Sequence, residues 1–279
     1  MHIKCWGSRG SIPVSGKNYL KYGGETTCIE VRSSKGDTII IDAGSGIRAL
    51  GLKLIKEKLS GVHILFTHTH LDHILGFPFF LPLFDSSFII NVYGYSHDSY
   101  SIKNILNGIM RSPYFPIDLE TIQQAIKFIN ISDKPFRIGS IEIQPIFLNH
   151  PGGGLGYRFE ENGSVFIFLT DNELLDEMTG KILFHDYVEF CKNADLLIHD
   201  AEFNNDEYQK FKFWGHSSYT EAIRLGIKAN AKRIGLFHLN SSRTDDQVDF
   251  MVNSSKNIVS ELDSSLEVFA VNCGFKTVV

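Results

Sequence analysis

The sequence predicts an α/β fold in which two β-sheets lie between outer layers of helices. Short β-branched runs bounded by turns fill the first third of the chain, a pattern typical of strands and hairpins. Later, apolar strands alternate with segments of helical periodicity, and no linker rich in Pro, Gly or Ser interrupts this order. We therefore expect a single domain over residues 1–279, with two sheets sandwiched between helices.

The first elements are a hairpin and a helix. β-branched residues fill 27–32 and 38–42, and a Ser-Lys-Gly-Asp turn at 34–37 separates them, which predicts a β-hairpin. Apolar residues then recur at helical spacing from 47 to 55, which predicts a helix. The apolar strand VHILFT follows at 62–67.

The middle of the chain carries a helical insertion at about 96–126, interrupted by Arg-Ser-Pro-Tyr-Phe-Pro at 111–116. Its aromatic and aliphatic residues supply apolar surface, which suits packing on its own core, a lid or a homodimer contact. Strands resume at about 127–131 and 141–147.

In the last part of the chain, strands alternate with helices. The turn Glu-Asn-Gly at 161–163 predicts a second hairpin. Ser218 with Glu221, and Thr244 with Gln247, fit the capping-box pattern and predict two helix starts. The strands of this part are expected at about 155–160, 164–169, 194–200, 233–239 and, as the last one, 266–271.

Composition and charge narrow the function classes. Apolar residues make up 43% and charged residues 21% of the 279 positions, as in ordinary globular proteins. The net charge is -5 and the pI about 6.1, so the chain as a whole does not attract nucleic acid. No apolar run suits a signal peptide or a membrane span, and we expect a cytoplasmic protein. The four cysteines form no CxxC pair, which indicates neither a disulfide framework nor a thiolate zinc site.

The most informative segment is THTHLDH at 67–73, directly after an apolar strand. It places three histidines and one aspartate within six residues. Imidazole nitrogen and carboxylate oxygen suit zinc, manganese or iron. Two ligands on the turn and two at the following helix start can face different ions. A solvated polar loop is the simpler interpretation, but this clustering beneath a buried strand favours metal binding.

This segment resembles the metallo-β-lactamase superfamily, whose HxHxDH signature it matches letter for letter. The resemblance extends over nearly the whole chain, and it implies the αββα four-layer sandwich of that superfamily. It also implies seven ligands for two ions. These are His68, His70 and His150 for one ion, Asp72, His73 and His238 for the other, and Asp171 as a bridge.

The later ligands stand where the resemblance requires them, at strand ends. His150 follows a strand, Asp171 ends FLTD, and His238 ends RIGLFH. Each of the three alone is equally well a turn or strand-end residue, and only the set favours ligands. Asp42 in DAGSG matches a position at which an aspartate accepts a hydrogen bond from a ligand histidine. An aspartate that shapes a glycine turn is an equal alternative for Asp42.

The implied cofactors are two divalent ions, Zn or Mn, with Fe as a further candidate. Two such ions about 3.5 to 4 Å apart activate a shared water and hold phosphoryl oxygens during in-line displacement. Asp72, a ligand in the signature, is then also a catalytic residue.

A candidate general acid is His216 in Trp-Gly-His-Ser-Ser, at the entrance to a helix, where anions are favoured. LIHDAEF at 197–203 and the GHSSYTEA around His216 resemble the tRNase Z and phosphoribosyl cyclic phosphate phosphodiesterase branch. In that branch a histidine protonates the leaving oxygen and an acidic residue orients it, roles that fall to His216 and Asp200. A helix-capping histidine and a strand-end aspartate are the structural alternative. His199 is expected to be structural, because neighbouring side chains on a strand point to opposite faces.

The segment Gly-Ser-Arg-Gly-Ser at 7–11 resembles stretches in bacterial metallo-hydrolases of the same branch. Arg9, with Ser8 beside it, could bind a substrate phosphate through its planar fork of donors. Glu25 stands where related sequences often have Asn, and it adds negative charge on that side.

These features favour a dinuclear phosphodiesterase that cleaves a small or cyclic nucleotide-like phosphodiester by metal-bound hydroxide. A thioester, lactone or β-lactam hydrolase is an alternative, because the same hydroxide attacks carbonyls. A tRNA 3′-end endonuclease is another, but the sequence lacks the protruding Gly/Pro- and Lys-rich arm of that branch, so nucleic acid is not favoured. A di-iron electron-transfer protein would typically carry Glu where His70 stands, and a non-catalytic scaffold would have lost ligands.

Overall fold

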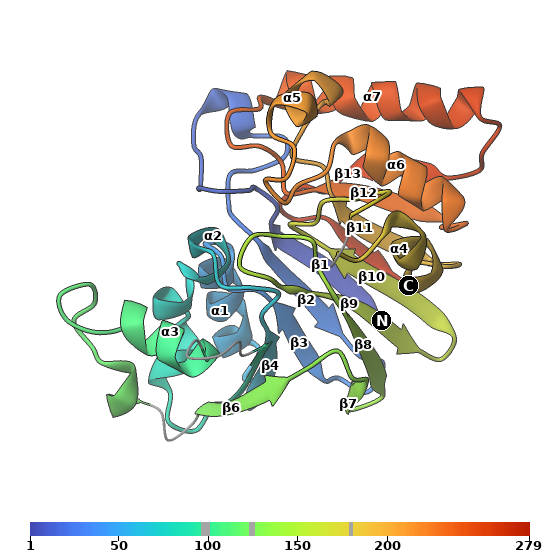
Figure 1. The fold of residues 1–279 in the computed structure, drawn as a ribbon. Coiled ribbons are helices and arrows are strands. Elements are labelled where there is room, and N and C mark those ends of the chain that lie inside the picture. The colour runs from blue at the N-terminus through green and yellow to red at the C-terminus, as the bar shows by residue number, and fades with distance from the viewer. Residues whose placement is uncertain (96–100, 123–125, 179–180) are drawn as a thin grey trace.

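The computed structural model describes residues 1–95, 101–122, 126–178 and 181–279. Its strands form two seven-stranded mixed sheets, and helices cover the outer sides of both sheets (Figure 1). The αββα four-layer sandwich predicted from the sequence is confirmed.

The first sheet has antiparallel pairing on one side of β3 and parallel pairing from β3 to β6. In spatial order its strands are β14 (Lys276–Val278), β1 (His2–Gly7), β2 (Cys28–Arg32), β3 (Thr38–Ile41), β4 (Gly61–Leu65), β5 (Ile89–Tyr95) and β6 (Ile126–Ile131).

The second sheet repeats this plan, with parallel pairing from β13 to β10 and antiparallel pairing from β10 to β7. In spatial order its strands are β13 (Glu267–Ala270), β12 (Arg233–Phe237), β11 (Leu196–Asp200), β10 (Ser164–Leu169), β9 (Leu155–Glu161), β8 (Ile141–Phe147) and β7 (Phe136–Ile138).

The helices divide between the two outer layers (Figure 1). The first sheet is covered by α1 (Ile47–Lys56), α2 (Leu71–Ile74) and α3 (Ile102–Ile109), and the second by α4 (Phe184–Phe190), α5 (Asn205–Lys210), α6 (Tyr219–Lys228) and α7 (Asp245–Glu261). Short 3-10 turns are η1 (Lys17–Tyr19), η2 (Phe77–Phe79), η3 (Leu81–Phe84) and η4 (Leu119–Thr121). Every helix among the described residues is too short or too polar to span a membrane.

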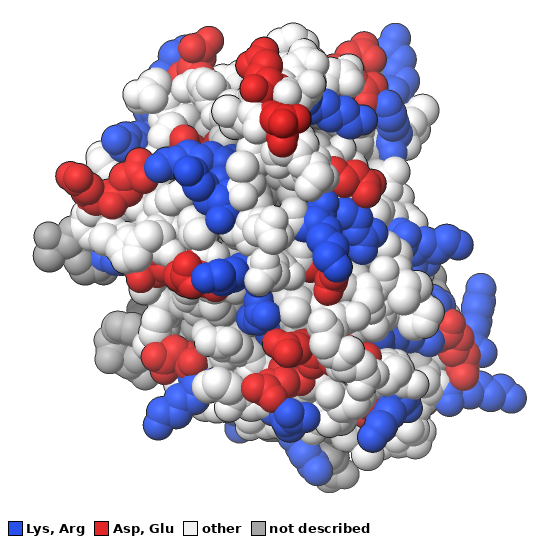
Figure 2. All heavy atoms as spheres, turned by 90° about the vertical axis from the view of Figure 1, so that its right-hand side faces the viewer, with Lys and Arg blue, Asp and Glu red and all other residues white. Residues whose placement is uncertain are grey.

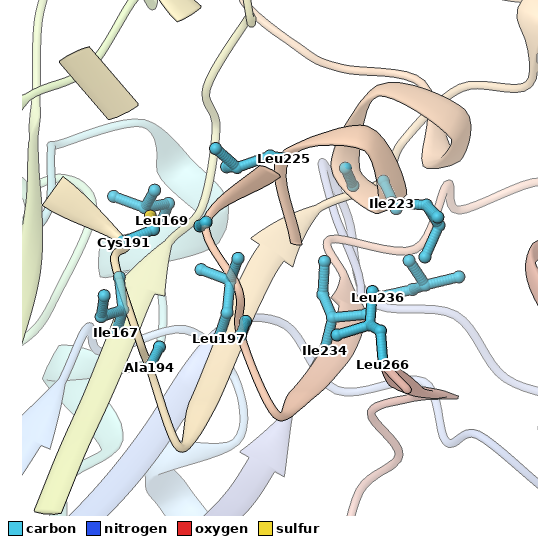
Figure 3. Packing of buried hydrophobic residues seen from close by; sticks show 14 of the residues in the cluster. Ile167, Leu169, Cys191, Ala194, Leu197, Ile223, Leu225, Ile234, Leu236 and Leu266 are labelled. Atoms are coloured by element: carbon cyan, nitrogen blue, oxygen red, sulfur yellow. The ribbon is translucent and has the colours of Figure 1, made fainter. Parts of the chain in front are cut away.

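Strand β10 illustrates how the layers are held together. Phe166 and Phe168 belong to the apolar core between the sheets. Ile167 and Leu169 belong to the core under the helices of the second sheet, to which α6 contributes Leu225 (Figure 3). Successive side chains of a strand point to opposite faces, and both faces of β10 are buried. This burial explains the continuous apolar run in its sequence.

The sequence predicted most strands and both helix starts. The two hairpins form as β2–β3 and β9–β10. The side chain of Ser218 accepts a hydrogen bond from the backbone of Glu221 at the start of α6. At the start of α7, the backbone of Thr244 donates to the side chain of Gln247.

Four strands were not expected, namely β1, β5, β7 and β14. The predicted last strand is followed by β14, which pairs with β1 and brings the two chain ends together. Since β14 has three residues and no buried side chain, it leaves no alternating pattern in the sequence.

The insertion expected to be helical at 96–126 contains the two-turn helix α3, followed by turns and η4. Residues 96–100 and 123–125 of the expected insertion lie outside the described residues. Ile102 and Leu106 of α3 are buried in the core that also holds β4 and β5. The helix therefore packs on the first sheet.

Candidate metal centre

The carboxyl ends of the parallel strands of both sheets carry the polar residues singled out in the sequence. In the first sheet, Asp42 follows β3 and the 67–73 loop follows β4. In the second, Asp171 follows β10, Asp200 ends β11, and His238 follows β12. Open α/β sheets bind ligands beyond these strand ends. The topology thus brings the two sets of side chains to one edge of the sandwich.

The structure brings all seven predicted ligands together in two groups that share Asp171. Within each group, one nitrogen or oxygen atom per residue lies within 4.8 Å of the others. The first cluster is His68, His70, His150 and Asp171, and the second cluster is Asp72, His73, Asp171 and His238. The division into two groups is the one that the family resemblance implied.

The backbone is unusual at three of these strand ends. Asp42, Asp171 and His238 have φ angles of 60°, 50° and 52°, in the left-handed region that residues other than glycine rarely adopt. Such conformations concentrate at functional sites, where the surrounding structure holds them in place. Here they turn the side chains at the ends of β3, β10 and β12 toward the clusters.

In the first cluster, nitrogen atoms from separate loops face one carboxylate. Nε2 of His150 lies 2.9 Å from Nδ1 of His70. Oδ2 of Asp171 lies 3.6 Å from Nε2 of His68 and 3.8 Å from Nε2 of His150. Nε2 of His68 is buried and has no hydrogen-bond partner among the described residues. Buried nitrogen atoms are normally paired, so this arrangement fits a metal ion as the missing partner.

In the second cluster, two imidazoles face two carboxylates. Nε2 of His73 lies 3.2 Å from Asp171 and 3.3 Å from Asp72. Nε2 of His238 lies 3.1 Å from Asp171 and 3.2 Å from Asp72. The backbone N–H of Ser11 donates to Oδ2 of Asp72 at 2.8 Å and fixes that carboxylate. This donor set also fits a divalent ion with nitrogen and oxygen ligands.

A second set of residues orients the imidazoles of the second cluster. Nδ1 of His73 lies 2.8 Å from Oδ2 of Asp42, and Nδ1 of His238 lies 2.9 Å from Oε2 of Glu202. Donation from Nδ1 to a carboxylate leaves the Nε2 lone pair facing the cluster, as in metal-binding histidines. The structure therefore places Asp42 where the resemblance put it.

In the first cluster, uncharged acceptors take the same role. Nδ1 of His150 lies 2.9 Å from the carbonyl oxygen of Gly215, and Nδ1 of His68 lies 3.1 Å from Oγ1 of Thr67. Thr67 in turn donates to Asp42 at 2.7 Å. The two clusters thus share one network of orienting groups beneath them.

Glu202 is a site residue that the sequence analysis missed. It is buried and accepts hydrogen bonds from His238 and from the side chain of Asn240. A Cβ atom on Gly10 would lie 2.8 Å from this carboxylate and 2.3 Å from the His238 ring, so only glycine fits there. The sequence feature that could have identified Glu202 is its spacing, because it stands two residues after Asp200. Alternate residues of an extended chain point to the same side.

Electrostatics keep the histidines of the first cluster neutral. Burial lowers the pKa of His68 well below its ordinary value, and the nearby His73 adds to this effect. Burial also lowers the pKa of His150, to about 4. A neutral imidazole is the form that binds metal.

Electrostatics make the second cluster attractive to cations. Burial opposes ionisation of Asp171, but His238 and His73 outweigh it and hold its pKa well below the ordinary value. Burial likewise opposes protonation of His73, but Asp171 and Asp72 outweigh it and raise its pKa well above the ordinary value. The carboxylates thus create a negative potential that stabilises positive charge at this point.

His216 and Asp200 form a pair beside both clusters. Nδ1 of His216 lies 2.6 Å from Oδ2 of Asp200, which is fully buried. The His216 ring lies 4.9 Å from the ring of His150 and 4.9 Å from that of His238. Burial opposes protonation of His216, but the charge of Asp200 and their hydrogen bond outweigh it and raise the pKa of His216.

The positions of Arg9 and Ser8 do not fit the substrate contacts expected from the sequence. Both side chains are fully buried. The Arg9 guanidinium donates to the carbonyl oxygens of Gly23, Asn240 and Arg243. Nε and Nη1 of Arg9 thus join the first loop of the chain to the loop after His238, and Nη2 lies 3.8 Å from Oδ1 of Asp245. His199, expected to be structural, is buried away from the clusters with Nδ1 on the carbonyl oxygen of Asp200.

A cavity of about 600 Å³ opens beside the first cluster. His68 and His70 belong to its lining, together with the glycine loop 152–154 that follows His150. Cavities of this size hold small molecules. A substrate bound there would reach the first cluster directly.

Comparison with known proteins agrees with this geometry. A family model described as a beta-lactamase superfamily domain matches residues 37–239. Ribonuclease Z of Picrophilus torridus is 23% identical over 318 residues, which cover 99% of this chain and 96% of that protein.

Two solved structures share the fold over their whole length. The metallo-beta-lactamase fold protein YhfI from Bacillus subtilis has a TM-score of 0.72 and 21% identity, covering 99% of this chain and 98% of that one. The short form of human tRNase Z has a TM-score of 0.64 and 18% identity, covering 100% and 99%. The chain belongs to the beta-lactamase superfamily and is a metal-dependent hydrolase with the metallo-β-lactamase fold.

Proposed function

We propose that the protein is a dinuclear phosphodiesterase that cleaves a small or cyclic nucleotide-like phosphodiester. The proposed ions are zinc or manganese, because the donor set is nitrogen and oxygen without thiolate. The first ion would be held by His68, His70 and His150, the second by Asp72, His73 and His238, and Asp171 would contact both. When bound, the two ions activate a water molecule and polarise the phosphoryl oxygens.

The chain's own residues then supply orientation and a proton. Asp42 and Glu202 hold the Nδ1 protons of His73 and His238, so that their Nε2 atoms stay available as ligands. Ser11 holds Asp72 through its backbone N–H. His216 donates the proton of Nε2 to the leaving oxygen, because its Nδ1 is engaged by Asp200.

The observation that carries the proposal is the pair formed by His216 and Asp200. An alkoxide leaving group of a phosphodiester is a strong base, and its departure needs a proton. The His216 ring contacts one histidine of each cluster, His150 and His238. Hydrolysis of a thioester places no such demand on a dedicated acid, because a thiolate leaves without a proton. The pair therefore favours P–O cleavage over the thioester alternative, and the lactone and β-lactam alternatives are decided by the substrate panel.

A small substrate is favoured by the distribution of charge. The net charge of the chain is -5, and on the face that Figure 2 shows, Lys and Arg are interspersed with Asp and Glu. Binding of RNA draws most of its affinity from clustered Lys and Arg. The relative from Picrophilus torridus is named ribonuclease Z. An RNA 3′ end is therefore the second candidate substrate, and it is included in the substrate panel below.

The experiment is a substrate panel assayed with the zinc- or manganese-loaded protein. It contains a cyclic mononucleotide, phosphoribosyl cyclic phosphate, a thioester, a lactone, a β-lactam and a short RNA with a 3′ extension. We expect turnover of a small phosphodiester, lost in His68→Ala and kept in His185→Ala, whose side chain is exposed. Turnover of the thioester, lactone or β-lactam alone would contradict the proposal. Turnover of the RNA alone would contradict a small substrate.

A further inference from the structure

Beyond the metal-binding residues, the described side chains that line the cavity beside the first cluster are mostly apolar, and Thr67 and Thr69 add hydroxyl groups. Its far wall is formed by Tyr95 at the end of β5, Ile102 and Ile105 of α3, and Phe147 at the end of β8. The rings of Tyr95 and Phe147 meet edge to face, with centroids 5.3 Å apart. Among the described lining residues, none is Lys, Arg, Asp or Glu.

Close packing of α3 on the first sheet sets the position of this wall. A Cβ atom on Gly94 would lie 2.8 Å from Cβ of Ile102, so the helix can approach β5 this closely only over glycine. Ile102 and Ile105 stand three residues apart and share one face of α3. The helix therefore presents both side chains to the cavity that ends at His68 and His70.

The cavity thus has two chemically different ends. At one end lie the imidazoles of His68 and His70, which belong to the first cluster and suit an ion that holds a phosphoryl group. At the other end lie two aromatic rings and two isoleucines, and the backbone of Gly152 and Gly153 also lines the cavity. The described residues of this wall offer no charged partner to a second phosphate or a carboxylate, and burying such a group without a partner costs free energy because it loses its hydration.

We propose that this cavity binds an uncharged aromatic ring of the substrate, such as a nucleobase, and that α3 serves as its specificity wall. This inference rests on the proposed function in that a phosphoryl group occupies the adjoining clusters. The ring would lie against Tyr95 and Phe147, and Ile105 would cover its edge. Flat rings gain affinity here from apolar burial and ring contacts.

The test compares the binding of phenylphosphonate and methylphosphonate to the zinc-loaded protein by calorimetry. Both probes carry the same charged group and neither is hydrolysed, so the ratio of their Kd values reports the cavity alone. We expect phenylphosphonate to bind about 10-fold tighter or more, since burial of a ring contributes well over the 1.4 kcal/mol of a tenfold change. Equal affinities in the unmodified protein would overturn the inference.

Matched variants locate the effect on α3. Ile105→Asp is expected to bring the ratio to within about 2-fold of unity. Ile109→Asp, one turn further along the helix, should keep the ratio, because Ile109 is equally half-buried but does not line the cavity. If circular dichroism shows that Ile105→Asp does not fold, Ile105→Ala takes its place, with a ratio about 3-fold lower expected. An unchanged ratio in the folded Ile105 variant would also overturn the inference.

The outcome is separate from that of the substrate panel. If the protein prefers phenylphosphonate but hydrolyses no phosphodiester, the aromatic cavity is supported and the proposed reaction is refuted. If the protein hydrolyses phosphodiesters without preferring phenylphosphonate, the cavity proposal is refuted and the proposed reaction is supported.

Discussion

Nδ1 of His216 lies 2.6 Å from Oδ2 of the fully buried Asp200. Sixteen positions separate the two residues in the chain, yet β11 and the loop before α6 bring them together beside both clusters. A histidine held in this way has one fixed tautomer and a raised pKa. These are the properties of a general acid.

The first prediction concerns this pair. His216→Ala should lower kcat/KM for diesters with alkyl leaving groups by about 10²- to 10⁴-fold, the usual contribution of a general acid. Esters of p-nitrophenol should be slowed far less, because p-nitrophenolate leaves without a proton. Steady-state kinetics on both ester types, with elemental analysis to verify that metal content is retained, checks this. Equal slowing of both would exclude an acid role.

The second prediction concerns Glu202, which orients His238. Glu202→Ala should weaken metal binding by about 10- to 100-fold, as is usual when a partner of a ligand histidine is removed. Glu202→Gln should be intermediate, because its amide oxygen still accepts the Nδ1 proton. Competition with a chromophoric chelator measures both, and Glu189→Ala, a change at an exposed site, is the control. Unchanged affinity in Glu202→Ala would show that His238 needs no partner.

The third prediction separates the structural role of Arg9 from a substrate role. Arg9→Met removes donors from three carbonyl oxygens in a buried site. It should lower the free energy of unfolding by about 1 to 3 kcal/mol, while KM for a small phosphodiester stays within about 2-fold of the original value. Chemical denaturation and kinetics test this together. A raised KM with unchanged stability would show that Arg9 contacts the substrate.

The fourth prediction concerns the pH dependence of stability. Burial opposes ionisation of Glu30. The hydrogen bonds that Glu30 accepts from Lys53 and Trp6, together with the charge of Arg32, outweigh this effect and lower the pKa of Glu30. A lowered pKa in the folded state stabilises the protein above the unfolded-state value of about 4.3, and this contribution disappears as the pH falls through the folded value.

Glu30→Gln should therefore be less stable than the unmodified protein at pH 7, by about 1 to 3 kcal/mol. The difference should shrink below about pH 4. Denaturation at several pH values checks this, with Glu160→Gln, about half-exposed on β9, as the control. A difference independent of pH would show that the charge of Glu30 is not involved.

The sequence predicted the parts of this protein that depend on local chemistry. The signature from His68 to His73 is contiguous, so its metal-binding character is visible without a fold. His150, Asp171 and His238 needed the family resemblance, because nothing local distinguishes them from other strand-end residues. What the structure adds is their convergence through the matching strand ends of two sheets.

Long-range packing explains what the sequence did not predict. Arg9 was predicted to bind a substrate phosphate, but it is buried and donates hydrogen bonds to residues more than 230 positions away. Glu202 is a ligand partner only because β12 places His238 beside it. The short strand β14 forms through pairing with β1 rather than through its own pattern. Each outcome depends on contacts that composition and periodicity do not contain.

The central claim is that seven side chains hold two ions bridged by Asp171. Asp171→Ala should lower the metal content from two ions per chain toward one, while Asp176→Ala, at an exposed site, should retain two. The most direct measurement is anomalous diffraction from crystals of the unmodified zinc-loaded protein. We predict two peaks, one about 2 Å from nitrogen atoms of His68, His70 and His150, the other at this distance from Asp72, His73 and His238, with Asp171 contacting both. A single peak, or peaks away from these residues, would contradict the claim.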